Sequence, residues 1–479
     1  MDSSDEGSTS RPKKPKVIII GAGIAGIAAG ESLTRMGFSD FKILEASNRT
    51  GGRIWTINVD DKGHKAELGA NWIHGIERNP IYQIADQNHL LQLRHLNKTL
   101  RSRDITLTES GEQVPRKIIK EVDLKYGMLL MECDDFYQLG LPTPEENDSV
   151  GAHLDRKFEE KLDRYCEEDR KLRSLIFSQR KLMECCISGC DSLNDVSLGD
   201  FGCYEDLPGV HYTIPPGFET IIDLLKKTIP KDNILLNHQV RCIYWNQSEV
   251  NKDHYDVCVE CENGKLFYAD HAIVTVSVGI LKVAYERMFN PPLPVEKQHA
   301  IESLGFGIVD KVMLQFDEPI VEADVHRIEF LWDDDKSTKH DLPNTWFRRI
   351  YSFQVIHDNI LLGWVCGKEA LYMESLTEDR IAQDCVMVLK KFLKKDDIPL
   401  PKQVIRTRWG NNANTRGSYS FLPVGSTVGD IESLSEPLGD PEKPQVLFAG
   451  EATHPSFYST THGALLTGYR EAERISEIY

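Results

Sequence analysis

Val17-Ile18-Ile19-Ile20-Gly21-Ala22-Gly23-Ile24-Ala25-Gly26 is the stretch that decides the fold of this chain. A short apolar run leads directly into a Gly-x-Gly-x-x-Gly motif, and a helix-forming stretch follows it to about Gly37. Residues 41–44 form a second apolar run that ends at Glu45. Runs of this kind are typical of strands that are buried on both faces of a parallel sheet. The order therefore predicts a strand-helix-strand unit and an α/β fold of the Rossmann type.

The glycine motif has the chemistry of a dinucleotide-binding turn. Gly21 allows the tight turn, Gly23 lets the backbone approach a pyrophosphate, and Gly26 packs the helix against the strand. The start of the helix offers unpaired N–H groups to the phosphates. Glu45 lies about 20 residues further on, where it can accept hydrogen bonds from ribose hydroxyls. The motif occurs in both NAD and FAD sites, so it leaves the choice of cofactor open.

Composition limits the classes to which the chain can belong. With 479 residues it is long enough for two or three domains, and no apolar run approaches the roughly 18 residues of a membrane span. The formal net charge of -18 disfavours nucleic acid and attracts cations. Residues 1–16 have no apolar core, so we expect a disordered leader rather than a secretory signal, with the fold starting at Val17.

The 11 cysteines follow no disulfide framework, which favours a reducing compartment. Cys258 and Cys261 form a CxxC in a strand-like run, where alternation separates their side chains, so no metal site is expected. The expected location is the cytoplasm. The basic residues 11–16 leave the nucleus open as an alternative, and the peroxisome also stays open although residues 477–479 are not Ser-Lys-Leu.

Segments at both ends of the chain carry a family resemblance. They are Gly51-Gly52-Arg53, Glu67-Leu68-Gly69-Ala70-Asn71-Trp72-Ile73-His74-Gly75, Phe448-Ala449-Gly450-Glu451-Ala452-Thr453-His454 and Ser459-Thr460-Thr461-His462-Gly463-Ala464. With these segments the chain resembles the flavin-containing amine oxidases, and within them the animal spermine and N1-acetylpolyamine oxidases. The resemblance extends over residues 17–479 and is densest at the two ends.

The resemblance implies a Rossmann-like FAD-binding domain that is interleaved with an α+β substrate-binding domain. The expected FAD-binding segments are 17–90, 206–300 and 405–479, and the expected substrate-binding segments are 91–205 and 301–404. Within the second domain, the charged stretch 153–180 is typical of an exposed helix.

FAD is expected to be bound without a covalent link, because no cysteine lies between Cys385 and Tyr479, the region that holds the FAD-tethering cysteine in monoamine oxidases. A helix that starts near His462 would face the flavin edge that becomes negative on reduction. The residues expected to contact the cofactor are Gly21, Gly23, Ala25, Gly26, Glu45, Gly52, Arg53, Gly69, Ala70, Asn71, Trp72, Val240, Trp409, Gly450, Glu451, Thr460 and Thr461.

The resemblance also assigns catalytic and substrate-binding residues. Lys311 matches the lysine that these oxidases hold near flavin N5 through a water. Tyr419 matches one wall of the aromatic cage that guides the amine, and the opposite wall falls on Thr460. His74 and Glu184 match positions that contact substrate nitrogens. Without the resemblance, Lys311 would be a lysine that snorkels to solvent, and Glu184 a solvated helix residue.

The expected activity is FAD-dependent polyamine oxidation. An acidic tunnel would draw in spermine or an N1-acetylated polyamine, and a hydride would pass from the carbon next to a nitrogen to flavin N5. Water would hydrolyse the imine to a shorter polyamine and an aminoaldehyde, and O2 would be reduced to H2O2. The alternatives are a flavoprotein that senses polyamines without turnover and an amine oxidase of another substrate class. We expect a monomer or weak dimer with no nucleic-acid partner.

Overall fold

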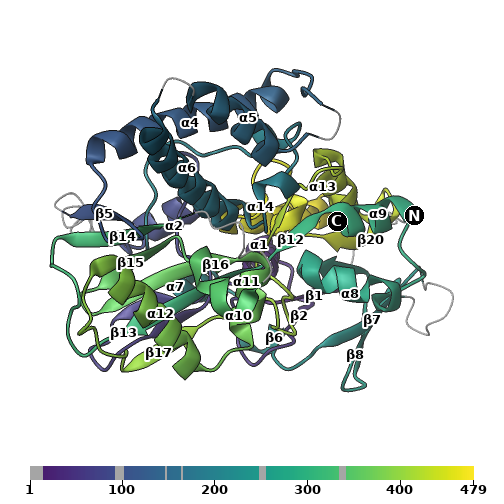
Figure 1. Ribbon diagram of the computed structural model, residues 1–479. Helices are drawn as coiled ribbons and strands as arrows, with labels where there is room; N and C mark the ends of the chain where they lie inside the picture. Colours follow the sequence, from purple (N-terminus) through teal and green to yellow (C-terminus); the bar gives the residue numbers. More distant parts are fainter. Residues whose placement is uncertain (1–13, 92–101, 146–147, 163–164, 247–254, 334–340) are drawn as a thin grey trace, which may run out of the picture.

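The structure is a computed structural model, and it describes residues 14–91, 102–145, 148–162, 165–246, 255–333 and 341–479. Most of the predicted leader therefore lies outside the described residues. Two large sheets organise the rest of the chain (Figure 1). Among the described helices, none combines the length and the hydropathy that a membrane crossing requires.

The first large sheet contains the predicted strand-helix-strand unit at its centre. Its strands are β1 (Val17–Ile20), β2 (Phe41–Leu44), β6 (Ile234–Leu235), β10 (His271–Val274), β19 (Leu438–Asp440) and β20 (Lys443–Phe448). They lie in the order β19-β20-β10-β1-β2-β6, and every pair is parallel except β19 with β20. The glycine motif connects β1 to α1 (Ile24–Arg35), as the sequence predicts.

Both faces of this sheet are buried because the side chains of β1 alternate between two apolar clusters. Val17 and Ile19 pack on the side of α1, α7 (Glu219–Lys226) and α14 (Thr461–Ile478). Ile18 and Ile20 pack on the other side, against a small sheet in the order β11-β7-β8-β9 and three helices. These elements are β7 (Val240–Trp245), β8 (Val257–Cys261), β9 (Leu266–Ala269), β11 (Phe289–Asn290), α8 (Val278–Met288), α9 (Val295–Ser303) and α13 (Val428–Ser435).

The second large sheet is antiparallel except for its last pair. Its strands are β5 (Arg103–Thr108), β13 (Val309–Gln315), β14 (Val325–Leu331), β15 (Ser352–His357), β16 (Ile360–Cys366) and β17 (Gln403–Arg406). They lie in the order β17-β13-β16-β15-β14-β5, with β5 parallel to β14. One face packs on α11 (Gly367–Glu374), α12 (Glu378–Leu393) and the 3-10 turn at Trp346–Arg349, which follows α10 (Leu342–Thr345). The other packs on α4 (Arg116–Gln138), α5 (Val150–Leu162) and α6 (Glu167–Ser188), which lie above the sheet in Figure 1.

The charged stretch 153–180 is not one exposed helix, so that prediction is wrong. The stretch is divided between α5 and α6, and one face of each helix is buried. Arg173 and Arg180 are themselves buried, where they form ion pairs with Glu121 at 3.0 Å and Glu329 at 3.1 Å. Local charge suggested solvent because these carboxylate partners lie far away in the sequence.

Two short strand pairs complete the described strands. β3 (Thr56–Asn58) pairs with β4 (Lys65–Glu67), and β12 (Gly305–Gly307) pairs with β18 (Tyr419–Phe421). The remaining helical elements are α2 (Pro80–Gln87) and the 3-10 turns η1 (Leu193–Asp195), η2 (Phe201–Cys203), η3 (Lys231–Asn233), η5 (Trp346–Arg349) and η6 (Glu451–Thr453). The expected boundary between residues 404 and 405 falls inside β17, and the division into two domains stays a prediction.

Candidate active site

A cavity of about 600 Å³ is lined by residues from both large sheets. This volume is within the range of small-molecule and cofactor sites. The lining includes every residue that we expected to contact cofactor or substrate, except Gly26 and Glu184. The expected residues found there are Gly21, Gly23, Ala25, Glu45, Gly52, Arg53, Gly69, Ala70, Asn71, Trp72, His74, Val240, Lys311, Trp409, Tyr419, Gly450, Glu451, Thr460 and Thr461.

The glycine turn is open to the cavity on one side and closely packed on the other. Apart from its chain neighbours, no described atom lies within 4 Å of the place where Gly23 would carry a Cβ. A Cβ on Gly26 would lie 2.0 Å from the carbonyl oxygen of Gly21, so a larger residue would push α1 away from β1. An open backbone before a helix N-terminus suits a pyrophosphate.

The carboxylate of Glu45 is buried beside this turn. Its Oε2 accepts a hydrogen bond from the Ala22 N–H at 2.7 Å. Its Oε1 accepts from the N–H and the hydroxyl of Ser47 at 2.8 and 2.7 Å. The carboxylate is therefore oriented by the protein, and Oε2 still has a lone pair for a further donor. The contact with a ribose stays a prediction.

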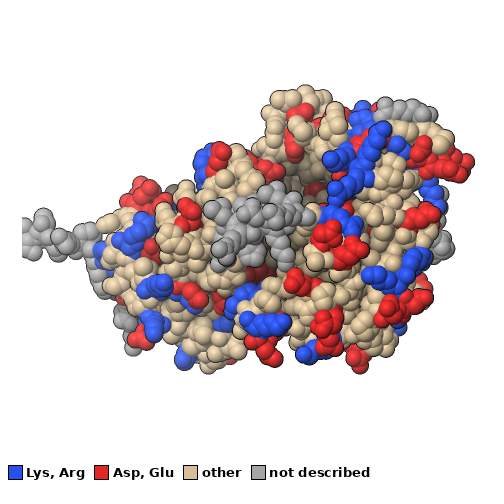
Figure 2. Space-filling model, turned by 90° about the vertical axis from the view of Figure 1, so that its left-hand side faces the viewer, with Lys and Arg blue, Asp and Glu red and all other residues tan. Residues whose placement is uncertain are grey.

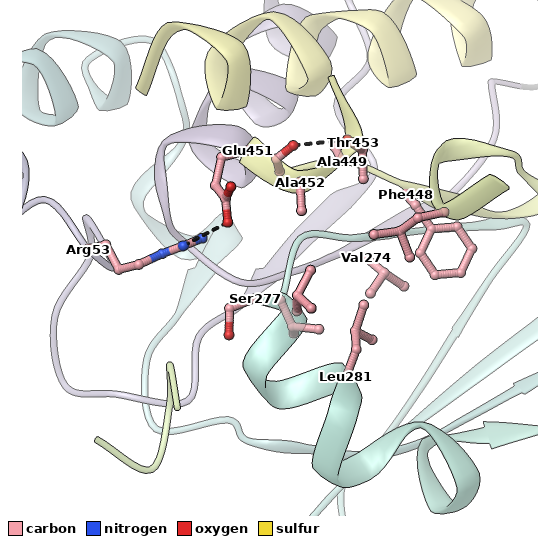
Figure 3. Close-up of a pocket in the computed structure, with 13 residues that line it drawn as sticks. Arg53, Val274, Ser277, Leu281, Phe448, Ala449, Glu451, Ala452 and Thr453 are labelled. Carbon is pink, nitrogen blue, oxygen red and sulfur yellow. Dashed lines mark hydrogen bonds and ion pairs between the residues drawn. The ribbon is translucent and has the colours of Figure 1, made fainter. Parts of the chain in front are cut away.

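Arg53 and Glu451 form an ion pair that joins the two ends of the chain. Arg53 Nη1 lies 2.9 Å from Glu451 Oε1, and the two side chains point toward each other in Figure 3. Arg53 also donates to the carbonyl oxygen of Ser418 at 2.8 Å. Glu451 Oε2 accepts from the Ser420 hydroxyl at 2.6 Å and from the Ser459 N–H at 2.9 Å. The pair fixes a guanidinium at the cavity wall, where it can bind a phosphate.

The helix α14 begins beside the cavity, close to the predicted residue. Thr460 is its N-cap, since Oγ1 accepts from the Gly463 N–H at 2.9 Å and donates to the carbonyl oxygen of Phe457 at 2.7 Å. The partial positive charge of a helix N-terminus favours an anionic group in this part of the cavity. The substrate contact of Thr460 stays a prediction, and the cap already engages its hydroxyl.

Lys311 lies on β13 and is only 2% exposed. Its Nζ donates to the carbonyl oxygens of Glu67 and Gly69, both at 2.7 Å, and lies 4.5 Å from the ring centre of Trp364. Burial lowers the pKa of Lys311 to about 7, although the charge of Glu67 opposes the shift. The interpretation as a snorkelling lysine is therefore wrong. An amine with a pKa near neutrality is suited to holding or releasing a proton at the cavity.

Hydrogen bonds orient both expected aromatic residues. Trp409 Nε1 donates to the carbonyl oxygen of Leu68 at 3.1 Å, and its ring meets that of Trp55 edge-on with centroids 6.5 Å apart. The Tyr419 hydroxyl donates to the carbonyl oxygen of Cys186. The roles of Trp409 and Tyr419 toward flavin and amine stay predictions, but neither ring can turn without losing a bond.

His74 is a neutral imidazole at the cavity wall. Burial, with a smaller contribution from His211, lowers the pKa of His74 to about 4. The two rings meet edge-on with centroids 5.1 Å apart. A neutral imidazole can accept a hydrogen bond from an ammonium group, which an imidazolium cannot do.

Glu184 is buried on α6 but is not among the described residues that line the cavity. The Ser188 hydroxyl donates to its Oε1 at 3.1 Å, and burial raises its pKa to about 7. Cys186 and Ile187 on the same helix do line the cavity. The interpretation of Glu184 as a solvated residue is wrong, while its contact with a substrate nitrogen stays a prediction.

Comparison with known proteins agrees with this geometry. Residues 24–476 match the family model for flavin-containing amine oxidoreductases. The chain belongs to this family. It is 35% identical to a peroxisomal N(1)-acetyl-spermine/spermidine oxidase of Bos taurus, over 100% of this chain and 98% of that protein. The Homo sapiens protein of the same name is also 35% identical, over 98% of this chain and 96% of that protein. Polyamine oxidase 1 of Oryza sativa subsp. japonica is 29% identical, over 98% of this chain and 98% of that protein.

A solved structure of a putrescine oxidase double mutant with redesigned cofactor binding has the same fold. The TM-score is 0.65 at 19% identity, over 97% of this chain and 99% of that one. The predicted fold class, the FAD cofactor and the enzyme class of this amine oxidoreductase are therefore confirmed. The open turn at Gly23, the guanidinium of Arg53 and the start of α14 line one cavity and fit an elongated dinucleotide. Attachment without a covalent link stays a prediction.

Some cavity residues of this flavoenzyme had no recognisable signal in the sequence. They are Cys186, Arg327, Tyr351, Gln354 and Trp364. Strand register places three of them, because Trp364 is the cross-strand partner of Lys311, and Arg327 is that of Gln354. Alternation along a strand tells which residues share a face, but it does not tell which strand lies alongside.

The expected acidic tunnel is wrong for the part of the chain that the structure describes. The carboxylates in the described lining are Glu45 and Glu451, and protein donors engage both. Near Lys311 the lining is aromatic and neutral, with Arg327 as a second cation. The face shown in Figure 2 carries acidic and basic side chains interspersed. The negative net charge of the chain is therefore not concentrated as carboxylates in the described lining of the cavity.

Proposed function

We propose that this flavoenzyme oxidises polyamines that carry an acetyl group at one end. The names of the two 35% identical relatives support acetylated polyamines as the substrate class. The observation that carries the preference is the part of the cavity lined by β14 and β15. Arg327 and Gln354 are cross-strand partners there and both line the cavity, and Asp104 lies close enough to the Arg327 guanidinium for the guanidinium to lower the pKa of that carboxyl group.

A guanidinium and an amide are donors that suit a carbonyl oxygen. The acetamide of an acetylated polyamine offers such an oxygen and carries no charge. A free terminal ammonium would instead meet a cation, with no free carboxylate in the described lining to offset the repulsion. The lining therefore supports an acetylated substrate over spermine.

The chain's residues have distinct roles in the proposed reaction. Bound FAD supplies the redox chemistry, in which a hydride leaves the carbon next to the amine nitrogen and O2 finally becomes H2O2. Tyr419 and Trp409 orient the alkyl chain, and burial favours the neutral amine that can lose a hydride. His74 accepts a hydrogen bond from a second nitrogen. Lys311 orients the water that hydrolyses the imine, and its low pKa lets it exchange a proton with that water.

The test is peroxide release and anaerobic bleaching of the purified flavoprotein. N1-acetylspermine, N1-acetylspermidine, spermine, spermidine and benzylamine are compared in parallel. We expect the acetylated amines to give the highest kcat/KM and benzylamine to give no bleaching. Preference for spermine would contradict the role of Arg327. Flavin that no amine bleaches would leave a protein that binds polyamines without turnover.

A charge reversal sharpens the test. Arg327→Glu should lower kcat/KM for N1-acetylspermine and raise that for spermine, because the wall then attracts a terminal ammonium. We expect the ratio of the two values to change about 100-fold, which corresponds to about 3 kcal/mol. Arg116→Glu, on the exposed start of α4, makes the same change in net charge and should leave the ratio unaltered.

The compartment and the oligomeric state belong to the same proposal. All 11 cysteines are free, which supports a reducing compartment such as the cytoplasm. The peroxisome is the alternative, supported by the names of the relatives. Cell fractionation distinguishes the cytoplasm from the peroxisome.

The oligomeric state is expected to be a monomer or weak dimer. Sedimentation of the holoenzyme tests this expectation.

A further inference from the structure

We infer that Asp310 and Glu374 share one proton and act together as positioning residues for Lys311 and Trp409. The effect on catalysis rests on the proposed function, whereas the shared proton does not. Asp310 precedes Lys311 on β13, so the two side chains point to opposite faces of the sheet. Lys311 faces the cavity, and Asp310 faces α11, which ends at Glu374.

Asp310 holds the segment that follows β17. The side chain is completely buried, and its Oδ1 accepts from the Thr407 hydroxyl at 2.6 Å and from the Trp409 N–H at 3.1 Å. The same Thr407 hydroxyl oxygen accepts from the Lys311 N–H at 2.8 Å. One carboxyl oxygen thus connects the backbone of Lys311 to that of Trp409.

Glu374 holds the next two residues of this segment. It is 3% exposed, and its Oε1 accepts from the Gly410 N–H at 2.7 Å while its Oε2 accepts from the Asn411 N–H at 2.9 Å. The two carboxyl groups therefore fix residues 407–411 from one side, and the bond from Trp409 Nε1 to Leu68 fixes the ring from the other.

The geometry requires a proton between the two acids. Asp310 Oδ2 is buried and has no donor among the described residues, and the two carboxyl groups hold the consecutive N–H groups of Trp409 and Gly410, so they lie beside each other. Two ionised carboxylates would repel each other at this contact, whereas a protonated Asp310 can donate to Glu374. Burial, reinforced by this bond, raises the pKa of Asp310 to about 8.

The charges around the pair do not remove the need for this proton. Arg406 on β17 directs its Nη1 to the carbonyl oxygens of Met373 and Glu374, at 3.2 and 2.5 Å, and not to either carboxylate. Burial and the charge of Arg408 lower the pKa of Arg406, while the charges of Glu378, Glu374 and Asp310 raise it, so Arg406 interacts with the pair at longer range without a hydrogen bond to either carboxyl group. Lys311 lies across the sheet and donates to Glu67 and Gly69 instead.

Paired substitutions of the holoenzyme separate positioning from simple packing. Asp310→Asn keeps an acceptor for Thr407 and Trp409 and supplies an N–H for Glu374, so kcat should stay within about threefold of the wild type and the visible flavin spectrum should not change. Asp310→Ala leaves buried donors without partners, so kcat should fall about 10-fold to 100-fold and the spectrum should shift. Equal impairment of the two variants would overturn the inference.

The proton itself is tested without any amine. The infrared spectrum of the wild type should contain the carbonyl band of a buried protonated acid, and Asp310→Asn and Glu374→Gln should both remove it. A raised pKa means that the folded protein binds this proton more tightly than the unfolded chain, so the wild type loses stability as the pH rises toward 8. The advantage of Asp310→Asn in melting temperature should therefore grow from pH 5 to pH 8 and then level off.

Asp384 on α12 provides the matched control. It is buried, but it accepts from Trp346 Nε1 and from the cation Arg380, both at 2.8 Å, so it has no acid partner with which to share a proton. Asp384→Asn should remove no band and show no growing advantage over this pH range. A wild type without the acid band, or an advantage of Asp310→Asn that is flat with pH, would overturn the shared proton even if amine oxidation is confirmed.

Discussion

Lys311→Met is the substitution that most directly tests how the fold controls its buried lysine. Methionine fills a similar volume but cannot carry the charge, and it also loses the two bonds to Glu67 and Gly69. The loss of those bonds changes stability by the same amount at each pH. The loss of the charge changes stability by an amount that depends on pH, so the two effects can be separated.

The magnitude follows from the pKa of Lys311, which burial lowers from 10.5 to about 7. Between these values the folded lysine is neutral while the unfolded lysine is charged, so the unfolded state binds more protons and stability rises with pH. The full shift corresponds to about 5 kcal/mol, present as a penalty below pH 7 and absent above pH 10.5. From pH 7 to pH 9 the wild type should gain about 2 kcal/mol relative to Lys311→Met.

The assay is urea unfolding of the wild type and Lys311→Met at several pH values between 7 and 9. Lys117→Met on the exposed face of α4 is the control and should follow the wild type throughout. A constant difference between wild type and Lys311→Met would refute the reasoning, because it would mean that Lys311 keeps its charge in the folded state. The same variant should release peroxide about 100-fold more slowly if Lys311 also serves as a proton carrier.

Other substitutions test the rest of the site. Gly69→Ala would bring a Cβ within 1.7 Å of the Arg53 carbonyl oxygen, so the purified protein should lose most of its flavin absorbance, whereas Gly127→Ala, in open space on α4, should retain it. Thr460→Ala removes the cap of α14 and should lower the unfolding free energy by about 1 kcal/mol, while Thr460→Ser should restore it. His74→Gln should be less sensitive to acid than the wild type. Because the pKa of His74 is about 4 in the folded protein, the unfolding free energy of the wild type should fall by about 3 kcal/mol between pH 6.5 and pH 4. Urea unfolding at both pH values measures this change. An equal loss in His74→Gln would contradict that assignment.

The local sequence pattern was sufficient to predict the elements whose structure depends on residues that are close together in the chain. The apolar run 17–20, the glycine turn and the second run at 41–44 predicted β1, α1 and β2 within a residue or two. The start of α14 was also predicted from its own residues. In these cases hydrogen-bond pattern, glycine geometry and burial act over a few residues, so the sequence carries the information locally.

The sequence by itself therefore determined the dinucleotide-binding unit of this protein and, through resemblance, its family. Only the tertiary structure decided what the site residues touch. Arg53 meets Glu451 across 398 positions of sequence, and Lys311 donates to Glu67 across 244. The position of Arg327 in the cavity wall depends on which strands lie side by side. Such contacts depend on strand register and on packing between distant segments, and no periodicity along the chain records either of them.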